Sequence, residues 1–571
     1  MKYLISIFLT VVLIANTAIA QQKDPEKDPD NEKDSGYSGS VVVKGTHRPE
    51  ISDALKIKKN PQLKKIEIDK EPVTYDINSI RLPVSFELKP IRPARMRGEP
   101  LEKLYNNHLR LAMGTSTMPY LEYFYNSTRS RDNSFGIHLK HHSASGKIKN
   151  RPFPGFSDNV AGIHYKKIFR NHILKTQAGY ERNVVHNYGV SKTVFDTINE
   201  IKKDDIRNLY NRMNASIDFK SDYPAYKSGK LHHAFDLDFY YFNTNENINE
   251  LNARLSGNVY GNLTFLDAAK EQYLGVKFGA SYLNNGGSLI QSVHRGLSYV
   301  NPYLKNKFDN IDLNVGLNMF VETDSASSRI KFYPDVSINM ELIKNILVLK
   351  GGITGKTSID HLYHLTNENP FIHHSIPQRY QHHRSVIFAG LNASISKAID
   401  FNAHFKASNL QTESFFIRDT SEVLSNRFRI RYDSVRSFYI KAEINYQLKD
   451  KLNVSLGGQY TDYSLTGLKE AWNRPNIEGY LKARYDLQEK IILSGELFYI
   501  GERKALGIKN DQFTTVSLNP IIDGNISAEY RYSKLLSAFL SFRNLAGQKY
   551  EQWSGYPTYG FQFMAGLTYS M

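Results

Sequence analysis

The 571-residue sequence contains no cysteine. This absence excludes disulfide bonds, thiolate metal sites and a lipid-modified cysteine. Beyond Gln21, no apolar run approaches the roughly 20 residues that a membrane-spanning helix needs. The sequence also lacks a G-x-S-x-G nucleophile elbow and a glycine-rich nucleotide loop between a strand and a helix. We therefore expect no enzyme activity, no catalytic residue and no bound cofactor.

Residues 1–20 predict a secretory signal peptide. Lys2 supplies a positive start, residues 4–14 form an apolar run, and cleavage is expected near Ala20 because residues 18–20 are small or apolar. A retained membrane anchor is the alternative, which the short run disfavours. Residues 21–40 are charged and almost without apolar side chains, so they predict a disordered tail.

Period-two alternation is the main pattern in the rest of the sequence. In the C-terminal stretch 559–571, large apolar groups fall on one face of an extended strand and small or polar groups on the other. The apolar face holds Phe561, Phe563, Ala565, Leu567 and Tyr569. Similar stretches recur at 233–242, 438–448 and 476–487. Such strands fit between lipid and a wet interior.

We count about 22 of these stretches, which predicts an all-β fold. Residues 105–571 are expected to form one transmembrane antiparallel β-barrel, preceded by a short flexible periplasmic segment at 41–104. The mean hydropathy of −0.46 does not oppose this prediction, because alternation hides the lipid-facing side chains. A soluble sandwich is the alternative, but its strands are usually shorter.

The predicted connections between strands alternate in length, as short periplasmic turns and long outer loops do in such barrels. The tight set is 170–171, 309–310, 344–345, 397–398, 449–451, 488–490 and 533–534. The long set is 144–158, 186–206, 360–382, 411–435, 463–475, 503–518 and 546–558. An even number of strands places both chain ends in the periplasm.

The formal net charge of +16 raises the question of an anionic partner. We expect no nucleic-acid binding, because the chain carries an export signal and no stacking or phosphate-loop motif. Attraction to outer-membrane lipid and lipopolysaccharide, or to an acidic protein, suits the expected location better. The favoured interpretation is that most of these charges line a hydrated lumen and the loops.

The C-terminal residues resemble the closing segment of TonB-dependent receptors of the Bacteroidota type. The resemblance rests on residues 495–503, 542–545, 549–551, 555–557 and Gly560. An isolated apolar patch resembles the part of these receptors near the contact with the energy transducer TonB; it consists of Val41, Val42, Val43, Lys44, Gly45 and Thr46.

This resemblance implies a multi-pass barrel in the outer membrane of a Gram-negative cell that binds or transports a ligand, with TonB or other outer-membrane or periplasmic proteins as partners. Receptors of this family carry a globular plug that is longer than residues 47–107. This sequence departs from the family pattern at residues 47–107, which are too few for such a plug. The alternative is therefore a plugless structural or assembly subunit of an outer-membrane complex, and a passive porin is a third option.

A barrel of about 22 strands is wide enough to need a filler. The pre-barrel segment, inward-folded outer loops or a separate subunit can supply it, and we expect a mixture of the first two. The basic run 89–97 can pair with lumen carboxylates such as Asp236, Asp238 and Glu443, or it is a solvated linker.

Six histidines crowd one predicted outer loop: His361, His364, His373, His374, His382 and His383. Imidazoles bind zinc, copper, nickel or iron, and a flexible loop can gather several. Their spacing matches no defined metal motif, so a polar loop with interfacial histidines is the favoured interpretation and metal capture is the alternative.

Overall fold

The computed structural model describes residues 72, 74–76, 103–197, 201–223, 230–263, 271–288, 290–325, 327–509 and 512–571. The chain divides into two units, Met1–Pro90 and Ile91–Met571, and the helices and strands of the described residues belong to the second. The predicted signal peptide, the charged tail, the Val41–Thr46 patch and the basic run 89–97 lie outside the described residues.

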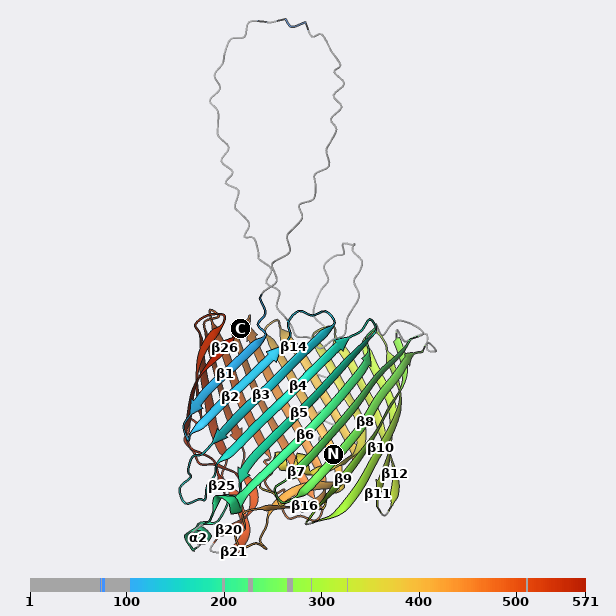
Figure 1. The fold of residues 1–571 in the computed structure, drawn as a ribbon. Coiled ribbons are helices and arrows are strands. Elements are labelled where there is room, and N and C mark those ends of the chain that lie inside the picture. Colours follow the sequence, from blue (N-terminus) through green and yellow to red (C-terminus); the bar gives the residue numbers. More distant parts are fainter. Residues whose placement is uncertain are drawn as a thin grey trace, which may run out of the picture. The chain divides into compact units, whose positions relative to one another are not determined.

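Twenty-two strands form the barrel wall (Figure 1). They are β1 (Asn107–Gly114), β2 (Met118–Asn126), β3 (Asn133–Ala144), β4 (Phe156–Ile168), β5 (His172–His186), β6 (Arg207–Ser221), β7 (Leu231–Thr244), β8 (Ile248–Asn262), β9 (Glu271–Gly287), β10 (Ile290–Lys307), β11 (Ile311–Asp324), β12 (Ser328–Ile343), β13 (Leu347–Ile359), β14 (Tyr380–Ser396), β15 (Ile399–Arg418), β16 (Phe428–Leu448), β17 (Leu452–Leu465), β18 (Ile477–Leu487), β19 (Ile491–Ile500), β22 (Ile521–Arg531), β23 (Leu536–Arg543) and β26 (Gln562–Ser570).

The remaining elements lie in connections between wall strands. They are the hairpin of β20 (Arg503–Lys509) and β21 (Gln512–Leu518), the short pair β24 (Glu551–Trp553) and β25 (Tyr556–Pro557), the helices α2 (Lys192–Thr197) and α3 (Leu362–Glu368), and the 3₁₀ turn η1 (Lys203–Ile206). No helix in the described parts of the chain is long and apolar enough to cross a membrane, which is a finding about helices only.

The sheet closes on itself because β1 pairs with both β2 and β26. All neighbours in the wall are antiparallel, and the closing register sets Leu111 opposite Leu567. Closure removes the free edges that an open sheet would expose. The predicted all-β barrel and its count of about 22 strands are confirmed.

The two faces of the wall carry the predicted alternation. On β16, Ile440 and Ile444 are 44% and 43% exposed on the outside. The intervening Lys441 and Glu443 lie on the other face, where their charged groups are 3.4 Å apart and Glu443 accepts a hydrogen bond from Tyr480 of β18. An apolar outside with paired charges inside is the arrangement that a bilayer and a hydrated lumen require.

Short turns follow several even-numbered wall strands, for example at 344–346, 397–398 and 449–451. All seven predicted tight turns lie at this end of the wall. The long connections lie at the opposite end. One predicted loop, 411–435, is wrong in extent: β15 runs to Arg418 and β16 begins at Phe428. A bulge between Leu410 and Glu413 interrupts the alternation of apolar and polar residues. Both strands therefore extend further than the alternating sequence pattern indicates.

Candidate functional site

The connection between β13 and β14, residues 360–379, reaches across the mouth of the barrel. Six strands separate β6 from β13 in the ring, yet this loop bonds to lumen-facing side chains of β6 and β8. Tyr210 of β6 donates to the carbonyl of Pro370 at 2.7 Å, and Arg212 Nη1 donates to Tyr363 Oη at 3.0 Å. The loop therefore lies over the lumen, consistent with the expectation that outer loops fold inward.

Glu250 of β8 anchors this loop to the wall. Its side chain is fully buried, and a carboxylate is an acceptor with about four lone pairs. It accepts hydrogen bonds from five donors: Tyr240 Oη at 2.7 Å, Asn285 Nδ2 at 2.8 Å, Leu362 N at 2.6 Å, Tyr363 N at 3.2 Å and Gln378 Nε2 at 2.6 Å. Two of these donors are the backbone amides that begin α3, so Glu250 fixes the position of this helix.

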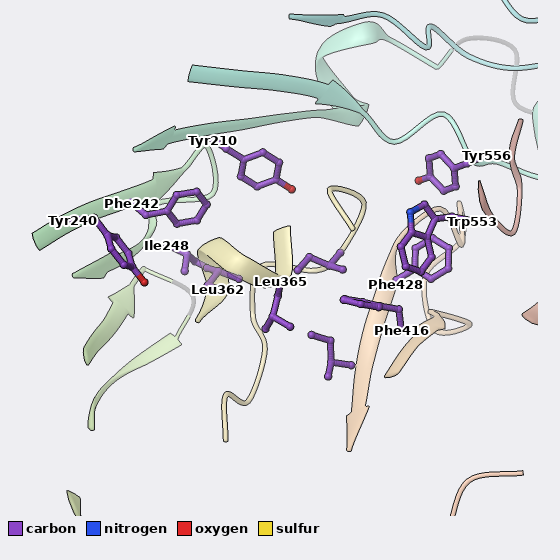
Figure 2. Close-up of a cluster of buried hydrophobic side chains, with 12 residues drawn as sticks. Tyr210, Tyr240, Phe242, Ile248, Leu362, Leu365, Phe416, Phe428, Trp553 and Tyr556 are labelled. Atoms are coloured by element: carbon purple, nitrogen blue, oxygen red, sulfur yellow. The ribbon is translucent and has the colours of Figure 1, made fainter. Parts of the chain in front are cut away.

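A buried apolar cluster fills the mouth around α3. Figure 2 shows Leu362 and Leu365 of the helix between Tyr240, Phe242 and Ile248 on one wall and Phe416 and Phe428 on another. Trp553 and Tyr556 add the connection between β23 and β26 to the same cluster. Each fully buried large side chain contributes about 1.5–3 kcal/mol. The loops thus pack together around a core of their own. We call these loops the mouth cap; they are residues 187–190, 360–379, 419–427 and 544–561.

Arg418, at the end of β15, joins three loops of the mouth cap. Its side chain is 5% exposed. Its Nε donates to Ser425 O at 2.7 Å, its Nη1 donates to Ser554 O at 3.1 Å, and its Nη2 donates to the carbonyl of Gly189. Gly555 has φ of +83°, and a Cβ there would collide with the guanidinium. A glycine is therefore required where the chain passes Arg418.

A cavity of about 890 Å³ lies between the mouth cap and the lumen face of the wall from β17 to β26. This size suits a small ligand. The cap supplies residues such as Tyr188, Phe371 and Tyr559, and the neighbouring connection between β3 and β4 supplies Pro154. The wall supplies polar groups that include Lys482, Arg484, Ser494, Glu496, Asn525, Ser527, Ser541 and Arg543.

The charged groups of the cavity carry a positive surplus. Lys482 Nζ lies 3.1 Å from Glu496 Oε1, so this pair is neutral as a whole. Arg484 and Arg543 have no carboxylate within ion-pair distance among the residues that the structure describes. Two unpaired guanidinium groups beside aromatic rings favour an anionic ligand, because they offer forked donors for carboxylate or phosphate oxygens.

The structure distributes the six histidines over several places. His361 and His364 lie at the start of α3 with ring centroids 5.2 Å apart, and His361 Nδ1 is 2.8 Å from Tyr240 Oη. Burial lowers the pKa of His361 to about 4. His382 and His383 are not loop residues as predicted, because β14 begins at Tyr380 and includes both.

His373 and His374 are neighbours that contact different carboxylates. His374 Nδ1 is 2.9 Å from Glu246 Oε2, and Arg427 Nη1 lies 2.6 Å from Glu246 Oε1. Burial opposes ionisation of Glu246, but the hydrogen bonds and charges of His374 and Arg427 outweigh it and lower its pKa to about 2. This triad connects three loops, because Glu246 lies between β7 and β8.

His373 meets two acidic residues of the connection between β15 and β16. Its Nε2 lies 2.6 Å from Asp419 Oδ2 and 3.6 Å from Glu422 Oε1. Burial lowers the pKa of His373. Burial alone would raise the pKa of Asp419. Hydrogen bonds from Ser421 and Arg429, together with the charge of His373, outweigh burial and lower this pKa.

The partners of these histidines could not be predicted from the sequence. Glu246, Asp419 and Glu422 stand far from the histidines in the sequence and carry no motif, and Glu250 looks like any lumen carboxylate of an alternating strand. Only the closure of the barrel brings the loops together. The expected pairing of the basic run 89–97 with lumen carboxylates involves residues outside the described part.

The comparisons with known proteins concern the fold. No protein-family profile and no curated protein matches the sequence. The ferripyoverdine receptor of the outer membrane of Pseudomonas aeruginosa is similar in structure, with a TM-score of 0.61 and 12% identity over 83% of this chain and 72% of the receptor.

Two further solved structures are similar to a comparable degree. The siderophore receptor PirA from Acinetobacter baumannii has a TM-score of 0.61 and 10% identity over 82% of this chain and 81% of PirA. The iron transporter FrpB from Neisseria meningitidis has a TM-score of 0.61 and 9% identity over 82% of both chains. At such low identity the likeness shows the fold, which is that of the outer-membrane receptor barrels.

Proposed function

We propose that this chain is an outer-membrane receptor that admits a small ligand through the mouth cap and delivers it towards the periplasm. The observation that carries this proposal is the cavity beneath loops that cross the barrel mouth. A barrel of 22 strands without such loops would be a wide pore, whereas a covered cavity allows selective binding. The similar structures of siderophore receptors support the same function.

We further propose that the ligand is an anionic iron chelate and that TonB drives its uptake. The unpaired Arg484 and Arg543 support the charge of the ligand, and the siderophores of the similar receptors support its class. The Val41–Thr46 patch is proposed as the TonB contact on its resemblance alone. Outer-membrane lipid and lipopolysaccharide remain the expected surroundings of the wall.

Uptake of radioactive iron tests this function. A deletion strain is complemented with the wild-type chain or with the double variant Arg484→Gln/Arg543→Gln and offered a panel of ferric siderophores. We expect the wild type to restore uptake of at least one chelate and the double variant to reduce it at least tenfold, because a bidentate charged contact contributes about 1.5–3 kcal/mol.

The control variant is Arg131→Gln, an exposed arginine in the turn between β2 and β3. It should transport as well as the wild type. Uptake should also disappear in a strain without TonB, and removal of residues 21–46 should abolish crosslinking to TonB. Uptake of no chelate by the complemented strain would contradict the proposed ligand class.

The alternative of a structural or assembly subunit predicts a different result. Stoichiometric outer-membrane partners would then copurify with the chain in a strain without TonB, and deletion would disturb that complex without any defect in uptake. A passive porin would give steady ion conductance in a planar bilayer. The loops across the mouth give no support to an open pore.

A further inference from the structure

We infer that His373, Asp419 and Glu422 form a binding site for a divalent zinc-class cation in the mouth cap. One ligand atom from each side chain lies within 4.8 Å of the others, and the three residues come from two different loops. Imidazole nitrogen and carboxylate oxygen are ligands that zinc prefers. The inference concerns the mouth cap itself and holds whether or not the barrel transports a ligand.

The distances between the ligand atoms are close to those of a zinc site. Zinc with ligand bonds of about 2.0–2.2 Å in a tetrahedron separates its donors by roughly 3.3 Å. His373 Nε2 lies 2.6 Å from Asp419 Oδ2 and 3.6 Å from Glu422 Oε1. Side-chain shifts of less than about 1 Å would therefore admit the ion. Glu422 is 41% exposed on its side chain and free to adjust, and a water can complete the coordination.

The surroundings hold Asp419 in place as a ligand. Its Oδ1 accepts hydrogen bonds from Ser421 N at 2.9 Å and Ser421 Oγ at 2.8 Å. Arg429 Nε lies 2.6 Å from Oδ2, the same oxygen that faces His373. A carboxylate oxygen has two lone pairs, so it can accept from Arg429 and still bind an ion with the other. Such outer hydrogen bonds orient metal ligands in proteins.

Within the described residues, Nε2 of His373 also lacks a well-formed hydrogen bond. Although Nε2 is near Asp419, it lies outside hydrogen-bond geometry with any group in the described residues. A buried polar atom without a hydrogen bond is costly, and an ion would satisfy it. His374 Nδ1 is likewise without a well-formed hydrogen bond, although it lies 2.9 Å from Glu246 Oε2. Within the described residues, however, only His373 is grouped with two carboxylates that can hold an ion together with it.

A cation at this position would connect the loop 360–379 to the loop 419–427. Both loops belong to the mouth cap, so the ion would add a bond between them without contributing to the membrane-facing wall. Metal binding at such a site stabilises the arrangement of the loops that it joins. Zinc should therefore protect both segments from backbone hydrogen exchange.

Zinc titration of the full-length chain in detergent tests this inference. After removal of metal with a chelator, calorimetry with zinc chloride alone should show one strong site per chain. His373→Gln and Glu422→Gln should each weaken it at least tenfold, and zinc should slow hydrogen exchange at 360–379 and 419–427 only in the wild type. Glu422 is the more informative position, because its side chain is 41% exposed and His373 is its ion-pair partner among the described residues, so its replacement should leave the loop folded.

The matched control is His364→Gln, an exposed histidine on α3 outside the group. It should bind zinc as the wild type does. The same gel mobility shift on heating in every variant would show that each barrel is folded. Absence of a strong site in the wild type, or unchanged affinity in both His373→Gln and Glu422→Gln, would overturn the inference.

Discussion

Replacement of Glu250 by alanine should release the loop 360–379 from the barrel wall. The change removes the acceptor of five hydrogen bonds, two of which come from the backbone amides of Leu362 and Tyr363. A buried donor left without an acceptor costs about 1–3 kcal/mol. Some donors will find water, so we expect the docked loop to lose about 3–5 kcal/mol in total.

Hydrogen exchange at Leu362 and Tyr363 measures this loss directly. A loss of about 3 kcal/mol corresponds to roughly 150-fold faster exchange, since about 1.4 kcal/mol is a factor of ten. The matched control is Glu368→Ala on the same helix, whose carboxylate is 42% exposed and pairs with Arg474 at the surface. Exposed pairs contribute little, so this control should change exchange less than about fivefold. Equal rates in the two variants would show that Glu250 does not anchor the loop.

Replacement of Arg418 by methionine should loosen the contact between the loops 187–190, 419–427 and 544–561. Methionine keeps the length of the apolar stem but removes every donor, so the carbonyls of Gly189, Ser425 and Ser554 lose their partner. Hydrogen bonds to a charged group contribute about 1.5–3 kcal/mol each. We expect a cost of about 2–4 kcal/mol to the docked loops, because water will reach part of the site.

Limited proteolysis of intact cells measures the release of these loops. Cleavage within 544–561 should become at least tenfold faster in Arg418→Met. Arg431→Met provides the control, because Arg431 is exposed on the neighbouring β16 and the contacts of Arg418 do not involve it. If cleavage in Arg418→Met stays at the rate of the control, Arg418 does not hold the mouth cap together.

The barrel was readable from the sequence because lipid imposes a simple rule on each strand. Alternation at 438–448 and 559–571 predicted which side chains face outward, and Ile440, Ile444 and Leu567 are exposed there. Tight turns were equally readable, since two or three polar residues between alternating stretches leave few other arrangements. The long strands β15 and β16 were misjudged, because above the membrane both faces can be polar and the alternation ends at Thr412.

The mouth cap could not be predicted, because many of its contacts join residues that the sequence separates by a hundred positions or more. Glu250 lies 112 residues before Leu362, and Arg418 lies 136 residues before Ser554. The sequence placed His373 in the loop 360–382, but the two carboxylates that lie near it belong to another loop. The grouping of these three residues depends on how the loops fold over the lumen, and no local sequence pattern predicts that folding.

Labelling of single cysteines on whole cells tests most directly whether the loops cover the lumen cavity. The chain has no cysteine of its own, so Ser541→Cys in the cavity and Val423→Cys in a loop, where the side chain is 83% exposed, each introduce one reactive thiol. A bulky maleimide that cannot cross the outer membrane should label Val423→Cys at least tenfold faster than Ser541→Cys, and adding Glu250→Ala should remove most of that difference. Equal labelling of both cysteines in the otherwise unchanged chain would contradict a covered cavity.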